Sequence, residues 1–192
     1  MLNLNRPSRW SQRIYLAIVA FIAGSIALYM GLYQWRLIPW VWDPVFGNGT
    51  ENVLDSDVSK ELLKIIRLPD AILGAISYYG DVIFSMAGSN QRWKDRPWLV
   101  FFFGFYVIPP AFVSFILVLL QATVVGSWCF LCLVSAALSL LLIYFSYNEV
   151  AVSLTFLWRV WKKSRKISLV WKTFCGKPSE IAFEISKVFD SK

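Results

Sequence analysis

Long apolar stretches dominate the pattern of hydrophobic and polar positions along this chain. Four of them are each about as long as the roughly 20 residues that a helix needs to cross a hydrocarbon core. They are residues 14–33, 68–87, 98–120 and 128–147. The pattern predicts an all-α integral membrane protein with a four-transmembrane-helix bundle. The second stretch is the weakest, because it contains Asp70 and Asp81.

Basic residues are distributed unevenly between these stretches. Lys and Arg number three in the N-terminal tail, three in residues 91–97 and nine after Asn148, against four in the loop 36–67. Cytoplasmic segments of membrane proteins carry such an excess. We therefore expect both termini in the cytoplasm, and the 36–67 loop together with the start of the fourth helix on the outer side.

Two segments outside the apolar stretches also have helical patterns. Residues 57–66 predict a short amphipathic surface helix in the outer loop. Residues 156–174 interleave basic and aromatic side chains without an acid, which favours an amphipathic segment in the headgroup plane of the membrane lipid, with a docking face for a partner subunit as the alternative.

These patterns divide the chain into three parts. They are a cytoplasmic N-tail (1–13), a four-helix membrane domain (14–148) and a basic amphipathic cytoplasmic tail (149–192).

The composition supports this interpretation. Hydrophobic residues make up 57% of the 192 residues and charged residues 16%, whereas soluble domains have about 25% charged residues. The net charge of +7 is typical of a cytoplasmic face near anionic lipid, so we expect no nucleic acid partner. Histidine is absent, which removes the usual acid–base group at neutral pH.

A Cys-x-x-Cys pair, Cys129 and Cys132, stands where the fourth helix is expected to begin. With Ser127 as the N-cap, Cys129 would occupy the first turn, where backbone N–H groups and the helix dipole lower a thiol pKa. Cys132 would lie one turn deeper among apolar side chains. This geometry suits a redox-active pair.

Other interpretations of the cysteines are considered beside it. A metal site is not expected, because zinc needs about four N or S ligands and Cys175 is predicted on the opposite side of the membrane. Two unpaired cysteines that pack as small core residues, and a purely structural disulfide, both remain open.

The second helix carries small and acidic residues on one face. Asp70, Gly74, Ser77 and Asp81 recur at helical spacing, and carboxylates at membrane depth should face the interior of the bundle. For Asp70 we favour a polar wall around a bound head group, because it is expected at the level of the cysteines. For Asp81 we favour a role in helix association.

The chain contains Leu-Pro-Asp-Ala-Ile-Leu-Gly-Ala-Ile-Ser-Tyr at residues 68–78 and Trp-Cys-Phe-Leu-Cys at residues 128–132. Together with the order of the four spans, these segments resemble the vitamin K epoxide reductase family in its bacterial membrane form. The resemblance covers residues 14–148. It implies a bacterial inner (cytoplasmic) membrane protein that binds a quinone, ubiquinone or menaquinone, beside the Cys-x-x-Cys pair.

The resemblance also implies roles for individual residues. Cys129 would exchange with an incoming thiol from a thioredoxin-like dithiol partner on the outer side, and Cys132 would lie beside the quinone. Asp70 occupies the place of an asparagine that hydrogen-bonds a quinone carbonyl in the animal enzymes. Together with Gly74 and Trp128, it forms the expected quinone-binding set, and no metal is implied.

The chain departs from the family at two points. Residues 41–66 contain no cysteine, so the shuttle pair of the family is missing, as in a subgroup that lacks the loop cysteine pair. Ala136 stands where the animal enzymes carry a tyrosine that contacts the naphthoquinone.

Two functional hypotheses follow. The first is a membrane thiol–disulfide oxidoreductase, an enzyme that couples a dithiol to a quinone through Cys129 and Cys132. The second is a non-catalytic membrane subunit that binds quinone, lipid or pigment within a larger membrane protein complex.

Overall fold

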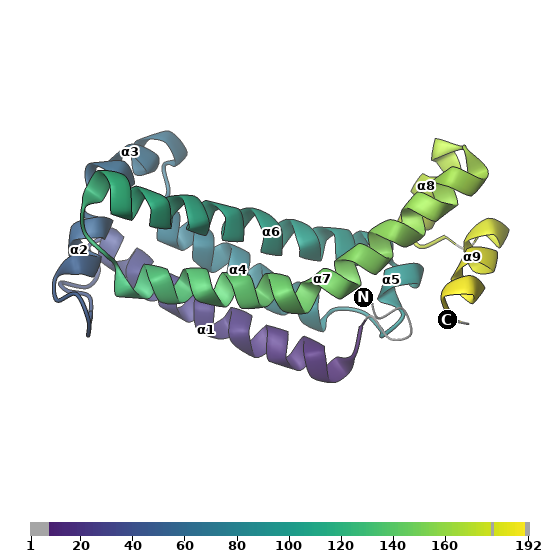
Figure 1. Cartoon of the computed structure of the whole chain (residues 1–192), viewed down its shortest axis with the longest axis horizontal. Helices are drawn as coiled ribbons and strands as arrows, with labels where there is room; N and C mark the ends of the chain where they lie inside the picture. Colours follow the sequence, from purple (N-terminus) through teal and green to yellow (C-terminus); the bar gives the residue numbers. More distant parts are fainter. Residues whose placement is uncertain (1–7, 178, 191–192) are drawn as a thin grey trace. The chain divides into compact units, whose positions relative to one another are not determined.

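The structure, a computed structural model, describes residues 8–177 and 179–190, and within these ranges the regular secondary structure is helical (Figure 1). Residues 1–7 of the predicted N-tail and residues 178, 191 and 192 of the predicted C-terminal tail lie outside the described residues. The elements are α1 (Trp10–Gln34), α2 (Gly49–Leu54), α3 (Asp57–Ile66), α4 (Asp70–Met86), α5 (Arg92–Asp95), α6 (Pro97–Leu120), η1 (Gln121–Val125), α7 (Phe130–Ser164), α8 (Ile167–Phe174) and α9 (Glu180–Asp190).

Three helical segments among the described residues are long and apolar enough to cross a membrane. They are Trp10–Gln34, Pro97–Val125 and Phe130–Ser164. Helix α4 has 17 residues, slightly fewer than the roughly 20 that a full span needs. An all-helical membrane protein is therefore what the structure supports, and the count of four spans stays a prediction.

The chain forms two compact units, which we describe separately. One consists of residues 18–82 and 106–143. The parts of α1, α4, α6 and α7 in this unit run side by side along a common direction (Figure 1). Helices α2 and α3 lie at the end of this bundle where α7 begins (Figure 1). Small residues allow close packing of its helices: a Cβ on Gly31 of α1 would lie 2.3 Å from Ile72 of α4, and one on Gly80 of α4 would lie 2.4 Å from Tyr106 of α6.

Helix α3, in the 36–67 loop, forms at the residues that its amphipathic pattern predicted. The hydroxyl of Ser56 caps it by accepting a hydrogen bond from the backbone N–H of Ser59 at 3.3 Å. Arg67 ends it in the left-handed conformation. These signals are local, which is why the sequence placed both ends of α3 correctly.

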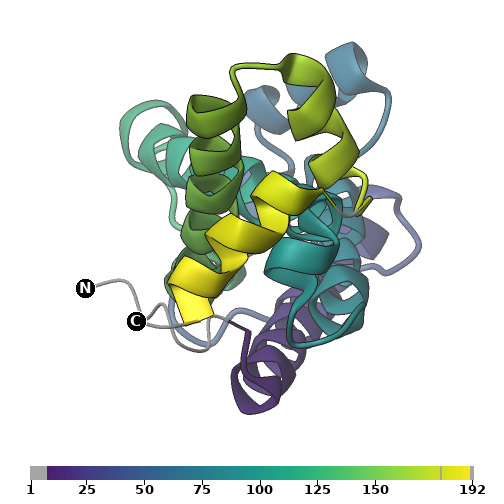
Figure 2. The ribbon, with the colours of Figure 1, turned by 90° about the vertical axis from the view of Figure 1, so that its right-hand side faces the viewer.

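The other unit contains the described residues of the ranges 1–17, 83–105 and 144–192. Its apolar core includes Trp93, Val152, Phe156 and Ala182. Helix α8 turns back beside the end of α7 (Figure 2), and Val170 of α8 packs against this core. Residues of the predicted basic tail thus share a core with α5 and α6, and their place in the headgroup plane stays a prediction.

Helix α7 also differs from the predicted fourth span, because it continues beyond Tyr147 to Ser164. No glycine or proline occurs between residues 148 and 164, so nothing local interrupts the helix. Its 35 residues correspond to about 52 Å, more than the thickness of a hydrocarbon core. The predicted boundary at residue 148 therefore falls inside a continuous helix.

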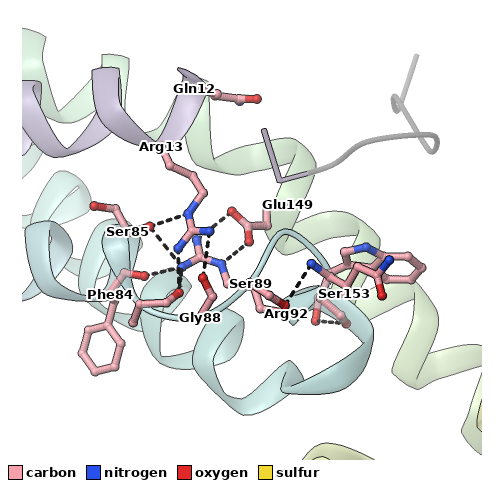
Figure 3. A network of polar contacts seen from close by, with 12 residues as sticks. Gln12, Arg13, Phe84, Ser85, Gly88, Ser89, Arg92, Glu149 and Ser153 are labelled. Atoms are coloured by element: carbon pink, nitrogen blue, oxygen red, sulfur yellow. Dashed lines mark hydrogen bonds and ion pairs between the residues drawn. The ribbon is translucent and has the colours of Figure 1, made fainter. Parts of the chain in front are cut away.

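Buried arginines connect three segments of the same unit (Figure 3). The side chain of Arg92 pairs with Glu149 of α7, and the exposed fractions of the two side chains are 0% and 5%. Arg13 donates to the carbonyl oxygens of Ser85 at 2.6 Å and Gly88 at 3.1 Å. The sequence predicts Arg13 as the last residue of an N-terminal tail. Helix α1 begins at Trp10, however, so Arg13 is a buried residue of this helix.

Candidate functional site

The two cysteines form a disulfide at the start of α7. Their Cα atoms are 5.2 Å apart. Helix α7 begins at Phe130, so Cys129 occupies the N-cap position, and its Sγ accepts a hydrogen bond from the backbone N–H of Cys132 at 3.0 Å. The backbone N–H of Cys129 donates to the side-chain oxygen of Gln121 at 3.2 Å.

This geometry corrects two expectations about Cys129. The predicted N-cap was Ser127, but the helix starts two residues later than that cap requires. Cys129 was expected to be the sulfur open to an incoming thiol, yet its exposed fraction is 0%. It belongs to an apolar cluster with Met30, Val41 and Leu54. The 36–67 loop therefore covers the sulfur that was expected to be open to an incoming thiol.

Asp43 ties this loop to the cysteine-bearing helix. Its carboxylate accepts hydrogen bonds from the backbone N–H groups of Val45 at 3.0 Å and Phe46 at 2.8 Å, and from the Thr50 hydroxyl at 2.6 Å. It also accepts from the backbone N–H of Phe130, in the first turn of α7, at 3.5 Å. One side chain thus orders the loop and joins it to the helix that carries Cys132.

The electrostatics of Asp43 follow from these contacts. Burial raises the pKa of its carboxyl, but hydrogen bonds from the Thr50 hydroxyl and from the backbone N–H groups of Phe46, Val45 and Phe130 outweigh burial and lower the pKa to about 2. A hydrogen bond to the charged form stabilises that form. Asp43 is therefore an anion at neutral pH, as this loop structure requires.

A glycine allows the loop to approach the helix so closely. A Cβ added to Gly49 would lie 2.2 Å from the backbone oxygen of Trp128, well inside the contact distance of any side chain. The short segment before α7 and the start of α2 are therefore packed backbone to backbone.

A cavity of about 90 Å³ lies beside the disulfide, lined by residues of α1, α2, α3, α4, α6 and α7. Cys132, Asp70 and Gly74 all line it, so the structure brings three of the predicted site residues together. Cys132 Sγ also contacts Met30 Sδ at 3.8 Å. Most of the lining is apolar, with a few hydroxyl, carboxyl and amide groups, as is usual for ligand pockets.

Asp70 is held in place by side chains from two other segments. Its carboxylate accepts a hydrogen bond from the side-chain amide of Gln34 at 2.5 Å, and the Ser59 hydroxyl of α3 lies at 3.5 Å. Ser59 lines the cavity as well. These contacts fix the carboxylate at the end of the cavity that α3 covers.

Other residues singled out from the sequence lie elsewhere. Trp128 does not line the cavity; its exposed fraction is 41%, because α7 begins after it and it does not share the helical face of Cys132. Ser77 and Asp81 also lie outside the lining, although Asp81 is only 1% exposed. The structure therefore separates Trp128 from this cavity, and the quinone-binding role of the whole set stays a prediction.

Several residues of this site are not among those that the sequence pattern predicts. Asp43 reaches the backbone N–H of Phe130, 87 residues away, and Gln121 accepts from the backbone N–H of Cys129, eight residues away; helical periodicity marks neither contact. Tyr78 follows the stripe of Asp70 and Gly74 by one turn and lines the same cavity, so helical spacing could have found it. Among the described residues, no group of His, Cys, Asp or Glu is arranged to hold a metal ion.

Comparison with known proteins gives one match. Residues 14–147 match the family model described as the Vitamin K epoxide reductase family. No curated protein and no solved structure matches the chain. The family match covers the disulfide, the cavity and α1, α4 and α6 almost completely. Because it spans well over half of the chain, the protein belongs to the vitamin K epoxide reductase family.

Proposed function

We propose that this protein is a membrane thiol–disulfide oxidoreductase that couples a dithiol to a quinone. Family membership implies a membrane redox function. The observation that carries the finer proposal is that Cys132, one half of the disulfide, lines the same cavity as Asp70 and Gly74. A redox-active sulfur thus faces a mostly apolar space that suits a flat ring.

The proposed reaction moves two electrons through the cysteine pair. A thiolate of the donor attacks Cys129 Sγ, the bond to Cys132 breaks, and Cys132 leaves as a thiolate beside the cavity. The second thiol of the donor then displaces Cys129, so the donor departs as a disulfide. When the Cys129–Cys132 bond forms again, the two thiols give up two electrons and two protons. A quinone bound in the cavity would accept both and become the quinol.

Asp70 and Gly74 have different roles in this proposal. Gly74 has no side chain, so it leaves room for a ring beside α4. The Oδ1 atom of Asp70 accepts from Gln34 and Ser59, so Asp70 is a hydrogen-bond acceptor in this structure. Asp70 therefore suits the hydroxyl of the reduced quinol better than the carbonyl of the quinone, unlike the asparagine of the animal enzymes.

Attack on Cys129 requires the loop to move, because that sulfur is 0% exposed. Loops that bind substrates generally open at low cost compared with global unfolding. A thioredoxin-like partner on the outer side would reach Cys129 once the contacts of Asp43 are released. This proposal includes α4 as a fourth, short membrane span, with both termini in the cytoplasm of a bacterium.

One observation favours the second candidate function, a non-catalytic membrane subunit that binds quinone, lipid or pigment in a larger complex. Cys129 is covered by a loop that itself contains no cysteine. Purification in mild detergent separates the two candidates: stable association with other membrane proteins, together with the absence of turnover, would support the subunit.

The test of the proposed enzyme uses three single variants, Cys129→Ser, Cys132→Ser and Cys175→Ser. The purified proteins are supplied with dithiothreitol, and the reduction of ubiquinone or menaquinone is followed. We expect activity only in the wild type and in Cys175→Ser, because Cys175 is a free, exposed cysteine. Equal rates in all four proteins would refute the proposal.

A further inference from the structure

Four residues with hydroxyl groups lie together beside the cavity, about two turns of α4 away from Asp70, where the backbone oxygen of Ser135 accepts from Tyr78 and Ser139. They come from three helices: Tyr78 of α4, Ser114 of α6, and Ser135 and Ser139 of α7. The Tyr78 hydroxyl lies 2.6 Å from Ser139 Oγ and also contacts the Ser114 hydroxyl. Tyr78, Ser114 and Ser135 line the cavity.

The protons of this cluster can be assigned from the contacts. Ser139 Oγ donates to the backbone oxygen of Ser135 at 2.9 Å, which uses its single proton. Tyr78 then donates toward Ser139 Oγ at 2.6 Å, and the backbone oxygen of Ser135 is a second, longer acceptor at 3.4 Å. A hydroxyl has one proton and two acceptor sites, so the oxygen of Tyr78 is left to accept from Ser114.

Ser135 is the member of the cluster that remains without a partner. Its residue is 7% exposed, and its Oγ has no hydrogen-bond partner in the protein. Buried polar side chains nearly always have a partner, and leaving one unpaired carries a desolvation cost. Because Ser135 lines the cavity, a molecule bound in the cavity can provide the missing hydrogen-bond partner.

We infer that the hydroxyl of Ser135 donates a hydrogen bond to a carbonyl of the bound quinone and so places the ring beside Cys132. Ser135 follows Cys132 by three residues on α7, which puts both on one face about 4.5 Å apart along the axis. A hydroxyl can donate to a carbonyl, whereas the carboxylate of Asp70 only accepts. This inference rests on the proposed function.

The two ends of the cavity also match the shape of a para-quinone. Asp70 and Tyr78 are separated by eight residues of α4, or about 12 Å. That is on the order of the span across a para-quinone ring, its two oxygens and one hydrogen-bonding group beyond each. Ser135 would therefore donate to one carbonyl of the quinone, and Asp70 would accept from the opposite hydroxyl only after reduction to the quinol.

The test measures binding and not turnover. Duroquinone, a symmetric para-quinone, is titrated into the purified full-length protein while the fluorescence of its 10 tryptophans is followed. We expect Ser135→Ala to raise the Kd about tenfold, as for one lost hydrogen bond, and Ser135→Thr to restore it. The control is Ser77→Ala, a half-buried serine of α4 outside the cavity lining, which should bind like the wild type.

Infrared spectroscopy of duroquinone bound to the wild type gives a second measurement that needs no variant. A hydrogen bond to one carbonyl should split the two equivalent carbonyl bands, and unsplit bands would overturn the inference. An unchanged Kd in folded Ser135→Ala would overturn it as well, while the proposed function would stand if the wild type still reduces quinone. A wild type that neither binds nor reduces quinone would refute both.

Discussion

Asp43 shows how much a single side chain determines in this protein. Five hydrogen bonds to its carboxylate order the loop and reach the first turn of α7. Hydrogen bonds to a charged group are worth about 1.5–3 kcal/mol each. At the scale of residues, the loop that buries Cys129 therefore depends strongly on Asp43 for its conformation.

Replacing Asp43 should expose the disulfide. In Asp43→Ala the loop loses its shared acceptor, so we expect dithiothreitol to reduce Cys129–Cys132 at least about tenfold faster, which corresponds to about 1.4 kcal/mol in the opening of the loop. Alkylation of the released thiols at timed intervals measures the rate. The matched control is Asp57→Ala, because the side chain of Asp57 is 99% exposed. Equal rates in both variants would mean that the reductant reaches the disulfide by another route.

The same carboxylate predicts a dependence of stability on pH. The pKa of Asp43 is lowered from 3.8 to about 2, so its contribution is fully present above about pH 4 and is lost as the pH falls toward 2. The Tm of the wild type should exceed that of Asp43→Asn by a constant amount at neutral pH. The difference should shrink below about pH 4. A difference that grows on acidification would contradict this assignment.

At the scale of elements, the last turn of α4 is tied to α5 and α7 by buried arginines. Arg92 donates to the carbonyl oxygen of Ala87 at 2.8 Å and to Glu149 Oε2 of α7 at 2.8 Å. Cations next to the last carbonyl groups of a helix are favoured by its dipole. Figure 3 shows Arg13 directed at the same turn. This cluster therefore satisfies backbone groups that helix α4 leaves unpaired.

Removing the negative partner of this cluster should destabilise the protein. In Glu149→Gln the guanidinium of Arg92 stays buried without its counter-charge, which typically costs about 3–5 kcal/mol. Chemical unfolding in detergent measures the loss. The control is Glu184→Gln, whose carboxylate pairs with Lys163 at the surface and should contribute less than about 1 kcal/mol. Equal losses in the two variants would contradict a structural role for the buried pair.

At the scale of the whole molecule, the orientation in the membrane follows from the basic residues. Fifteen of the 19 Lys and Arg fall in segments predicted to be cytoplasmic. Two of these, Arg13 and Arg92, are buried in ion-pair and carbonyl contacts. The excess on that side remains large without them, so the predicted orientation does not depend on these two.

Cys175 reports on this orientation, because it is exposed and unpaired while Cys129 and Cys132 form a disulfide. A membrane-impermeant maleimide should label Cys175 in inverted vesicles but not in intact cells. The control is Ile65→Cys in a Cys175→Ser background. Ile65 of α3 is 78% exposed and should be labelled in intact cells. Labelling of Cys175 from outside would reverse the proposed topology and place the disulfide on the cytoplasmic side.

The sequence by itself determined the features that depend on neighbouring residues. Apolar length located α1, α6 and the first half of α7, and a cap with amphipathic spacing located α3. The helical period also put Asp70 and Gly74 on one face, and the structure places that face on the cavity with Cys132. The continuation of α7 to Ser164 does not follow from the sequence pattern, because the composition becomes basic after Asn148 although the helix does not end there.

Only the tertiary structure decided what each site residue touches. Cys129 is buried because a loop held by Asp43 folds over it, and Asp43 is 87 residues away from Phe130 along the chain. Trp128 lies outside the cavity, and the partnerless hydroxyl of Ser135 lies inside it. Local propensity and periodicity carry no information about contacts between distant segments. Burial and hydrogen-bond partners arise only when those segments pack together, so they could not be predicted from the sequence.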